Sequence, residues 1–432
     1  MKTVAFYTLG CKVNQYDTEA MAELFEKSGY EVVSNTEKAD VYIINTCTVT
    51  NLGDRKSRQF IRRSKKNNPD SIIAVVGCYA QTAPEEVLAI EGVNLVIGTD
   101  ERNKIVQLVE KIDKENKLNY VNDIMSVNKF EELSIEEIKG KTRAFLKIQE
   151  GCNQFCAYCI IPYARGPIRS RRPENIIEEV KRLSQNGFKE IVLTGIHIAS
   201  YGKDLKDIDL IDIIKEVHNI EGIERIRLSS VEPTLLTEEF IEEITKLPKF
   251  CPHFHISLQS GCDETLKRMN RKYTTDQYRK IVKKLRASIP DIAITTDIIV
   301  GFPGESEEEF CQTFNFVQEM ELSQIHVFKY SPRKGTPAAK FKNQIPSKIK
   351  NYRSEKMIKL GEKMMRRYRE KFINEDIDVL FEDILDKDKR IITGFTSNYI
   401  KVAAKGSKNL IGEILPVKIR EIKNDIVFGE II

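Results

Sequence analysis

The chain has 432 residues, of which 41% are hydrophobic and 31% are charged, and its formal net charge is +4. This length exceeds what one typical hydrophobic core can organise, so we expect two to three domains. The composition is that of an ordinary globular protein, and the near-neutral charge gives by itself no indication of a nucleic-acid partner. Only the distribution of basic residues along the chain can indicate one.

The first residues, Met1–Gly10, are typical of a strand rather than of a secretory signal, because they lack a charged segment, a long apolar core and a cleavage site. No apolar run approaches the roughly 18 residues expected of a membrane span. We therefore expect a cytoplasmic protein with no membrane partner. Nine cysteines in a reducing compartment favour metal or redox chemistry over a disulfide framework, and an odd number cannot all pair.

From residue 1 to about residue 112, short apolar runs alternate with helical stretches such as Asp17–Lys27. This alternation predicts an α/β domain with a parallel sheet covered by helices. The expected strands are Thr3–Tyr7, Val41–Ile44, Ile72–Val76 and Leu95–Ile97.

Cys11, Cys47 and Cys78 each follow one of these strands. Because the carboxyl ends of parallel strands share one edge of a sheet, the three thiols are expected to converge there. Three unrelated buried cysteines are the alternative, but they do not explain the shared position. Zinc would need a fourth ligand, and residues 1–112 contain no His and no other Cys. An iron–sulfur cluster with one open iron fits both observations.

Residues 113–140 lose the apolar periodicity and gain charge. We expect them to form a connecting segment that docks as irregular structure.

Six strands alternate with helices in the next part of the chain, and a basic helix follows, so that this domain is expected to span residues 141–372. Six such units form an incomplete barrel of the triosephosphate isomerase type, whose reactive face lies at the strand carboxyl ends. We interpret the basic excess of the last helix as a solvated face rather than an RNA-binding one. The expected strands are Ala144–Ile148, Glu190–Leu193, Ile223–Leu228, His253–Leu258, Ala293–Ile299 and Gln324–Phe328.

Just after the first of these strands, Cys152, Cys156 and Cys159 form a C-x3-C-x2-C triad. A structural zinc site is saturated by four side chains, whereas an iron–sulfur cube held by three thiolates leaves one iron free for an outside ligand. Buried core thiols or half of a zinc knuckle are the alternatives. The next His is His197 and the next Cys is Cys251, so a fourth ligand is absent nearby. The pattern resembles the radical S-adenosylmethionine enzymes, in which the free iron binds that cofactor.

Other polar residues of this domain have weaker signals. Arg165, Arg169, Arg171 and Arg172 form a basic patch that we expect either to meet phosphate or to be solvated. We interpret the remaining His and Cys residues of interest as ordinary strand residues and thiols: His253, His255, Cys251, Cys262 and Cys311.

Residues 373–432 change to a strand-like periodicity with five short strands. This suits a small all-β barrel of the kind that binds oligonucleotides, and the interleaved Lys and Arg residues with Tyr399 are compatible with RNA contact. A purely structural barrel is the alternative. The expected strands are Ile377–Phe381, Arg390–Ile392, Tyr399–Ala403, Leu415–Ile419 and Ile426–Phe428.

With both cysteine triads in place, the chain resembles the radical S-adenosylmethionine methylthiotransferases over nearly its whole length. That family has an N-terminal cluster domain, a radical barrel and a C-terminal RNA-binding TRAM barrel. The motifs that carry the resemblance are Thr8–Glu19, Asn45–Val49, Gly77–Ala80, the triad at 152–159, Ile161–Gly166, Leu258–Gly261 and Gly301–Glu305.

Within the family, the residues Cys-Lys-Val-Asn-Gln from Cys11 and the stretch Thr194–His197 look like the branch that modifies N6-threonylcarbamoyladenosine in tRNA. That branch makes the 2-methylthio derivative beside the anticodon. The resemblance implies two 4Fe–4S clusters and S-adenosylmethionine. The cluster at the 152–159 triad makes a radical that removes hydrogen from C2 of the base, and the cluster at Cys11, Cys47 and Cys78 handles sulfur. General acid–base groups cannot activate such a C–H bond.

The resemblance also implies partners: a tRNA substrate and an electron donor such as flavodoxin or ferredoxin, with the sulfur donor left open. Our candidates for contacts with S-adenosylmethionine are loop residues that could instead be caps or turn residues. They are Tyr158, Gly195, Ser229, Glu232, Gln259 and Arg271.

Three other functions stay open. A cobalamin-dependent radical methyltransferase would need a His ligand to cobalt, and residues 1–196 contain no His. A methylthiotransferase acting on isopentenyladenosine in tRNA or on a ribosomal protein aspartate is a closer alternative. A non-enzymatic RNA-binding protein that uses its clusters for structure or redox sensing is the third.

Overall fold

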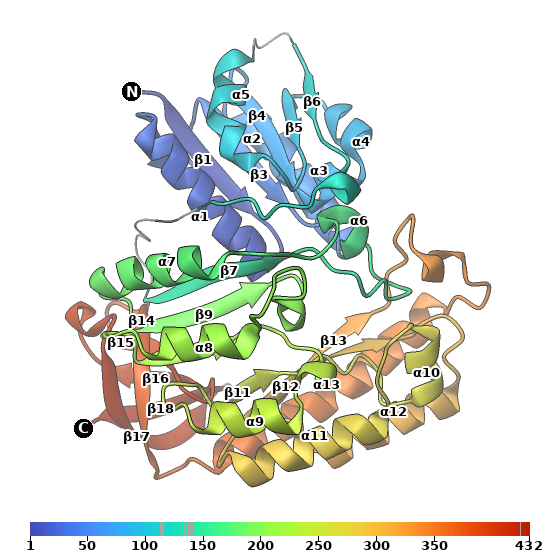
Figure 1. Cartoon of the computed structure of the whole chain (residues 1–432), viewed down its shortest axis with the longest axis vertical. Helices are drawn as coiled ribbons and strands as arrows, with labels where there is room; N and C mark the ends of the chain where they lie inside the picture. The colour runs from blue at the N-terminus through green and yellow to red at the C-terminus, as the bar shows by residue number, and fades with distance from the viewer. Residues whose placement is uncertain (113–115, 134, 136–141, 424) are drawn as a thin grey trace.

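The computed structural model describes residues 1–112, 116–133, 135, 142–423 and 425–432. Figure 1 shows an N-terminal sheet domain (blue) at one end, a central strand–helix part, and a C-terminal barrel (red) beside it. The predicted α/β class and the order of these three parts are confirmed. Within the described ranges, no helix combines the length and the hydrophobicity needed to cross a lipid bilayer.

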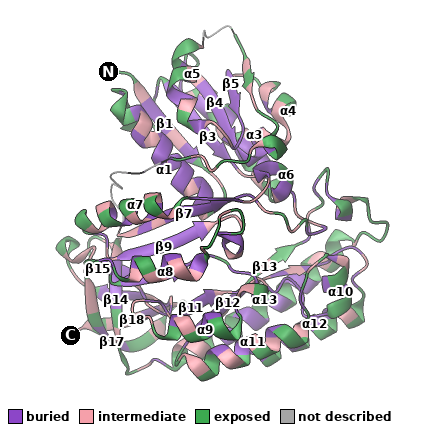
Figure 2. Ribbon diagram, viewed as in Figure 1, coloured by how far each residue is buried: buried purple, intermediate pink, exposed green. Residues whose placement is uncertain are grey.

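Six parallel strands form the N-terminal sheet in the order β2-β1-β3-β4-β5-β6. Its central strands are buried on both faces, which is why their sequences are nearly continuous apolar runs (Figure 2). Phe25 of α1 packs in the core on one face and Ile61 of α2 in the core on the other. The elements are β1 (Thr3–Thr8), α1 (Lys12–Lys27), β2 (Glu31–Val33), β3 (Val41–Thr46), α2 (Asn51–Asn67), β4 (Ile72–Gly77), α3 (Cys78–Thr82), α4 (Pro84–Leu88), β5 (Leu95–Ile97), α5 (Ile105–Lys111) and β6 (Leu118–Tyr120).

Strand β6 comes from the segment expected to be an irregular connection, yet it pairs in parallel with β5. Leu118–Tyr120 is therefore a strand rather than irregular structure. Residues 113–115, 134 and 136–140 of that segment lie outside the described residues. The domain limits at 112, 140 and 372 stay predictions.

The central part is an open barrel whose six parallel strands run in the order β7, β9, β10, β11, β12, β13. Isolated bridges from Ile226 to Phe250 and from Val231 to Ile256 join its two sheets. The short β8 adds an antiparallel edge to β7. The predicted incomplete barrel is confirmed. Its strands are β7 (Arg143–Glu150), β8 (Arg169–Ser170), β9 (Glu190–Gly195), β10 (Arg225–Leu228), β11 (His253–His255), β12 (Ala293–Val300) and β13 (Gln324–Lys329).

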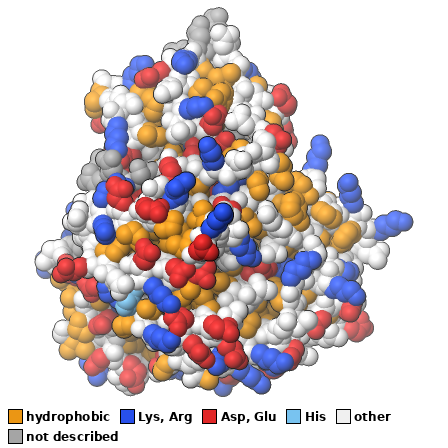
Figure 3. Space-filling model, viewed as in Figure 1, with side chains coloured by type: hydrophobic (Ala, Val, Ile, Leu, Met, Phe, Trp, Pro, Cys, Tyr) orange, Lys and Arg blue, Asp and Glu red, His pale blue; other side chains and the backbone are white. Residues whose placement is uncertain are grey.

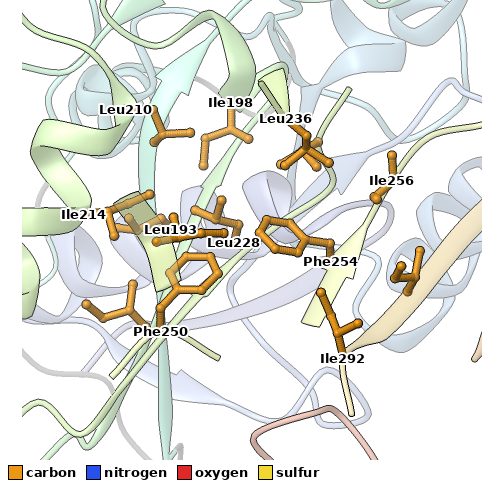
Figure 4. Close-up of a cluster of buried hydrophobic side chains, with 14 of the residues drawn as sticks. Leu193, Ile198, Leu210, Ile214, Leu228, Leu236, Phe250, Phe254, Ile256 and Ile292 are labelled. Carbon is orange, nitrogen blue, oxygen red and sulfur yellow. The ribbon is translucent and has the colours of Figure 1, made fainter. Parts of the chain in front are cut away.

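Side chains alternate along these strands between two environments. Leu193, Leu228 and Phe254 lie in the hydrophobic core between the strands and the surrounding helices (Figure 4). Because the side-chain period of a strand is two, Glu190 and Arg227 point to the opposite face, which is the interior of the barrel. The helices are α6 (Ile161–Arg165), α7 (Pro173–Gln185), α8 (Leu210–His218), α9 (Glu238–Thr245), α10 (Asp263–Arg268), α11 (Thr275–Ser288), α12 (Glu307–Met320) and α13 (Ser347–Glu370).

The C-terminal part is a closed five-stranded barrel in the order β14-β15-β16-β18-β17, as predicted. This barrel has its own apolar core, which includes Phe381 and Val402. Phe372, which follows α13, packs in the same core. The strands are β14 (Asp376–Asp386), β15 (Ile391–Thr396), β16 (Lys401–Lys405), β17 (Ile414–Lys423) and β18 (Ile426–Ile431).

Arg227 joins the two barrels. Its Nε donates to Glu190 Oε1 at 2.7 Å, and its Nη1 donates to the carbonyl oxygen of Ser397 at 2.9 Å. The guanidinium also lies 4.9 Å from the ring centroid of Tyr399, which stacks on His253. The expected RNA-facing Tyr399 is therefore engaged with the central barrel.

The loop after β12 is held by a buried carboxylate. Glu305 Oε2 accepts hydrogen bonds from the backbone N–H groups of Phe302, at 2.9 Å, and Gly301. Phe302 is fully buried and its ring lies 6.4 Å from that of Tyr158. Burial raises the pKa of Glu305 to about 7, although Arg353 opposes the shift.

We expect Arg227→Leu to lower the free energy of unfolding by about 3 kcal/mol, because it leaves the buried Glu190 carboxylate without its closest cation. The double variant Arg227→Leu, Glu190→Leu should recover much of that loss, since the buried carboxylate is then gone and Arg225 keeps its hydrogen bonds to the carbonyl oxygens of Phe395 and Asp378. Urea unfolding of both variants measures the difference. A double variant no more stable than the single one contradicts this account.

We expect stability to fall as the pH rises from about 4.5 to about 7, because the folded state holds the Glu305 proton more tightly than the unfolded state does. The contribution of this carboxyl group is on the order of 3 kcal/mol at most. Glu305→Gln keeps an acceptor oxygen for the two backbone N–H groups but cannot titrate. The melting temperature of both proteins is measured between pH 5 and pH 8, and it should decline less for the variant. If it declines equally for both, groups other than Glu305 cause the pH dependence.

Candidate active site

The barrel triad lies in the loop that follows β7. Backbone hydrogen bonds hold this loop at two points: Cys152 N–H donates to the Gly166 carbonyl at 3.0 Å, and Cys159 N–H donates to the Cys156 carbonyl at 2.9 Å. Desolvation raises the pKa of Cys152 to about 11 and that of Cys159 to about 12, and the neighbouring Cys156 thiol adds to both shifts. The three thiols therefore lie near one another; that they hold an iron–sulfur cluster stays a prediction.

A cation lies directly against this triad. Arg271 Nη1 donates to Cys156 Sγ at 3.2 Å, and its Nη2 lies 3.0 Å from Glu232 Oε1. Arg271 and Glu232 are thus an ion pair beside the thiols.

The three N-terminal cysteines also converge. Desolvation raises the pKa of Cys47 to about 12, and the thiols of Cys78 and Cys11 add to the shift. Gly10 has a φ of +109°, and a Cβ atom at this position would lie 2.9 Å from Cys47 Cβ. Only glycine therefore lets the loop carrying Cys11 approach Cys47 so closely. The convergence expected from the strand ends is found at the carboxyl edge of the sheet.

Arg165 connects the barrel to the N-terminal triad. It is the last residue of α6, it is fully buried, and its Nε donates to Cys78 Sγ at 3.3 Å. Its Nη1 lies 3.1 Å from Asp17 Oδ2 and 3.0 Å from Glu150 Oε1. Its Nη2 donates to Asn14 Oδ1 on α1. One side chain thus contacts both parts of the molecule.

The expectation that Arg165 and its neighbours meet phosphate or are solvated is wrong for three of the four arginines. Arg165, Arg169 and Arg171 are buried. Arg171 Nη2 lies 2.6 Å from Glu179 Oε2, and Arg169 Nη2 donates to the Arg165 carbonyl at 3.0 Å. The sequence cannot distinguish a buried guanidinium from a solvated one, because its partners come from distant segments.

A pocket of about 210 Å³ lies beside the barrel triad, where the barrel meets the N-terminal domain. Val49 and Thr50, which closely follow Cys47, line it from the N-terminal domain, and Cys159 lines it from the barrel. Gln259 and Asp297 add polar groups at the barrel strand ends. The remaining lining residues are Tyr158, Ile160, Ile161, Ile299, Phe328, Lys329, Tyr330 and Ser331.

Of the candidate contacts for S-adenosylmethionine, Tyr158 and Gln259 line this pocket. Ser229 is buried and its hydroxyl oxygen has no hydrogen-bond partner among the described residues. A buried polar atom of this kind is available to a ligand. Gly195 ends β9, where a Cβ atom would lie 2.9 Å from the Gln149 side chain. Each of these roles stays a prediction.

His197 lies beside Glu232 and extends the polar contacts around it. His197 Nε2 lies 2.9 Å from Glu232 Oε2, and its backbone N–H donates to Gln149 Oε1 at 2.7 Å. Arg271, Glu232 and His197 therefore form a chain of contacts that leads away from Cys156. Their meeting follows from strand position, because the motif Thr194–His197 lies at the end of β9 and Glu232 follows β10, the next strand of the barrel.

The donor chemistry of both triads fits an iron–sulfur cluster. Each offers three thiols and one arginine N–H aimed at a sulfur, and hydrogen bonds to sulfur are among the contacts that tune such clusters. Among the described residues, no three His, Cys, Asp or Glu side chains are arranged to hold a single metal ion. Cys251 and Cys262 are buried thiols and Cys311 is exposed, and their interpretation as ordinary cysteines stays a prediction.

Family models match two parts of the chain: the Radical SAM superfamily over residues 146–317, and the uncharacterized protein family UPF0004 over residues 3–98. Solved structures with the same fold include the radical S-adenosylmethionine methyltransferase TsrM from Kitasatospora setae, with a TM-score of 0.60. TsrM is 14% identical, and the match covers 78% of this chain and 77% of TsrM. At this identity the likeness shows the fold alone.

Curated relatives match almost the whole chain. The threonylcarbamoyladenosine tRNA methylthiotransferase MtaB of Bacillus subtilis is 47% identical over 97% of this chain and 94% of its own length. The protein of the same name from Aquifex aeolicus is 40% identical over 96% of this chain and all of its own. The tRNA-2-methylthio-N(6)-dimethylallyladenosine synthase of Thermoanaerobacter pseudethanolicus is also 40% identical, over 98% and 92%. The chain therefore belongs to the radical S-adenosylmethionine methylthiotransferase family, which implies a 4Fe–4S cluster and S-adenosylmethionine.

Proposed function

We propose that this protein methylthiolates C2 of N6-threonylcarbamoyladenosine next to the anticodon of tRNA. The observation that carries the proposal is the pocket lined at once by Thr50 and Cys159, because it joins the barrel triad to the segment that follows Cys47 of the N-terminal triad. A base in this space lies beside Cys159 of the barrel triad and beside Val49 and Thr50, which follow Cys47 of the N-terminal triad. The relatives whose names state this activity support the choice of substrate.

We assign one 4Fe–4S cluster to each triad. When bound, the cluster at Cys152, Cys156 and Cys159 supplies the electron that cleaves S-adenosylmethionine to a radical, and the cluster at Cys11, Cys47 and Cys78 holds the sulfur to be transferred. The residues proposed to hold S-adenosylmethionine beside the barrel triad are Tyr158, Gly195, Ser229, Glu232, Gln259 and Arg271.

The chain's own side chains prepare this chemistry in two ways. Arg271 and Arg165 place positive charge against Cys156 and Cys78, where thiolates and a bound cluster concentrate negative charge. The apolar lining of the pocket, including Ile160, Ile299 and Phe328, limits the access of water. A reactive radical in such a space is protected from side reactions.

The other assignments follow from the same proposal. The barrel of residues 373–432 is a TRAM domain that contacts RNA, and residues 1–112 and 141–372 are the cluster domain and the radical domain with its basic helix, joined by 113–140. The enzyme acts in the cytoplasm on tRNA and receives electrons from a donor such as flavodoxin or ferredoxin.

We expect the purified, reconstituted protein to add a methylthio group to tRNA that carries N6-threonylcarbamoyladenosine. Mass spectrometry of the digested nucleosides should show 2-methylthio-N6-threonylcarbamoyladenosine. Isopentenyladenosine tRNA and ribosomal protein with the target aspartate serve as competing substrates. Product from either of these, with none from the first, overturns the proposed substrate.

We expect the two triads to separate in their effects. Cys152→Ala should abolish formation of 5′-deoxyadenosine, whereas Cys11→Ala should retain it, and both should lose methylthiolation. Iron should fall from about eight atoms per chain to about four in each variant, since each loses one cluster. Cys311→Ala, which removes an exposed thiol, is the matched control and should keep both activities. Retention of deoxyadenosine formation by Cys152→Ala contradicts the assignment.

A further inference from the structure

Helix α2 carries an unusually dense set of basic residues. Its 17 residues include seven Lys or Arg and a single acidic residue, Asp54. Asp54 is buried and lies 2.6 Å from Arg333 Nη2 of the barrel, so it does not offset charge on the outer face. The exposed basic residues are Arg55, Lys56, Arg62, Arg63 and Lys66.

The spacing of these residues places them on one side of the helix. At 100° per residue, Arg55, Arg62 and Lys66 fall within about 40° of one another, and Lys56 and Arg63 lie beside that line. At about 1.5 Å per residue, the line from Arg55 to Lys66 is about 16 Å long. The inner side of α2 carries Ile61 and Ser57, which are fully buried. The outer side is a continuous basic stripe, here called the α2 stripe: Arg55, Lys56, Arg62, Arg63 and Lys66.

The charges of the α2 stripe are not neutralised by acidic side chains in the part of the chain that the structure describes. Across the part of the chain that the structure describes, none of its five residues forms an ion pair, whereas Arg58 on the inner flank pairs with Glu86. The basic helix α13 differs in this respect, because Arg366 pairs with Glu370 and Arg367 pairs with Glu321. Unpaired cations in a row favour a partner that presents regularly spaced negative charge.

The position of α2 indicates what that partner is. Thr50, the N-cap of α2, lines the pocket beside the barrel triad, and its side chain accepts a hydrogen bond from Gly53 N–H at 3.2 Å. At the same end, Val49 and Leu52 are more than half exposed, and Phe328 of the pocket lining is 45% exposed. The pocket mouth is thus apolar and the stripe leads away from it. Bases stack on apolar groups while phosphates meet cations, which is the arrangement of a nucleic-acid strand entering a site. Figure 3 shows Lys and Arg side chains mixed with Asp and Glu over the face that it presents.

We propose that the α2 stripe binds the phosphate backbone of the substrate tRNA while the target base occupies the pocket at the N-terminus of α2. The inference rests on the proposed function and assigns to the N-terminal domain a share of RNA binding, beside that of the C-terminal barrel. An acidic protein, such as an electron donor, is the competing occupant of a basic surface.

The test compares two triple variants of the full-length, reconstituted protein. Arg55→Gln, Arg62→Gln, Lys66→Gln removes three charges from the α2 stripe. Lys359→Gln, Arg366→Gln, Arg367→Gln removes three exposed charges from α13 and is the matched control. Filter binding to tRNA bearing N6-threonylcarbamoyladenosine is measured from 50 to 300 mM salt, and iron content and melting temperature confirm that both variants fold.

We expect the α2 variant to bind tRNA on the order of tenfold more weakly at about 0.15 M salt, with the slope of log K against log salt reduced by roughly two to three. The double variant Arg55→Lys, Arg62→Lys conserves the charge and should keep wild-type binding. The α13 variant should change binding by less than about threefold. If the α2 variant binds tRNA as tightly as the wild type does, the inference is wrong. This holds also if the variant binds tRNA normally but receives electrons poorly from a protein reductant, because the stripe then binds that protein instead. A wild-type protein that binds this tRNA but never methylthiolates it refutes the proposed function alone.

Discussion

A buried network of ion pairs between the N-terminal domain and the barrel is the interaction on which the site depends. Asp17 of α1 is fully buried; its Oδ1 lies 2.6 Å from Lys147 Nζ and its Oδ2 lies 3.1 Å from Arg165 Nη1. Although desolvation opposes ionisation, Arg102, Lys147 and Arg165 hold the pKa of Asp17 well below its usual range. Buried charges are tolerated only with such pairing, so the two domains cannot separate without exposing or orphaning them.

The same network explains why a cation stands beside Cys78. Glu150 is held at a pKa of about 2: desolvation works against this, and Arg165 and Lys147 outweigh it. Two carboxylates, Asp17 and Glu150, face three cations, because Arg102 also reaches Glu150 Oε2 at 3.5 Å. Arg102 in turn has its own carboxylate in Glu131, at 2.8 Å. The network thus holds three carboxylates and three cations, and Arg165 reaches Cys78 Sγ through its Nε, an N–H group that the carboxylates do not use.

How far the sequence predicts this molecule depends on whether the cause is local. Strands with long apolar runs, such as β3 and β4, are predicted because burial on both faces dictates their composition. Strands β2 and β6 are missed, since three partly exposed residues give no pattern. Spacing and strand position indicate two groups of three cysteines, and their role as cluster ligands stays a prediction. The burial of Arg165 is not, because its partners Asp17 and Cys78 lie far away in the sequence and meet it only in the folded chain.

The connection between the triads is short along the chain as well as in space. Cys159 is a member of the barrel triad, and α6 is the next helix along the chain. This helix ends at Arg165, which donates a hydrogen bond to Cys78. A helix of five residues is about 8 Å long and has few ways to bend. Its far end is fixed further because the Gly166 carbonyl accepts the Cys152 N–H. The position of Cys78 relative to Cys159 is thus set by one rigid turn of helix and one guanidinium group. The same segment also shapes the pocket, because Cys159, Ile160 and Ile161 line it from the barrel opposite Val49 and Thr50 of the N-terminal domain.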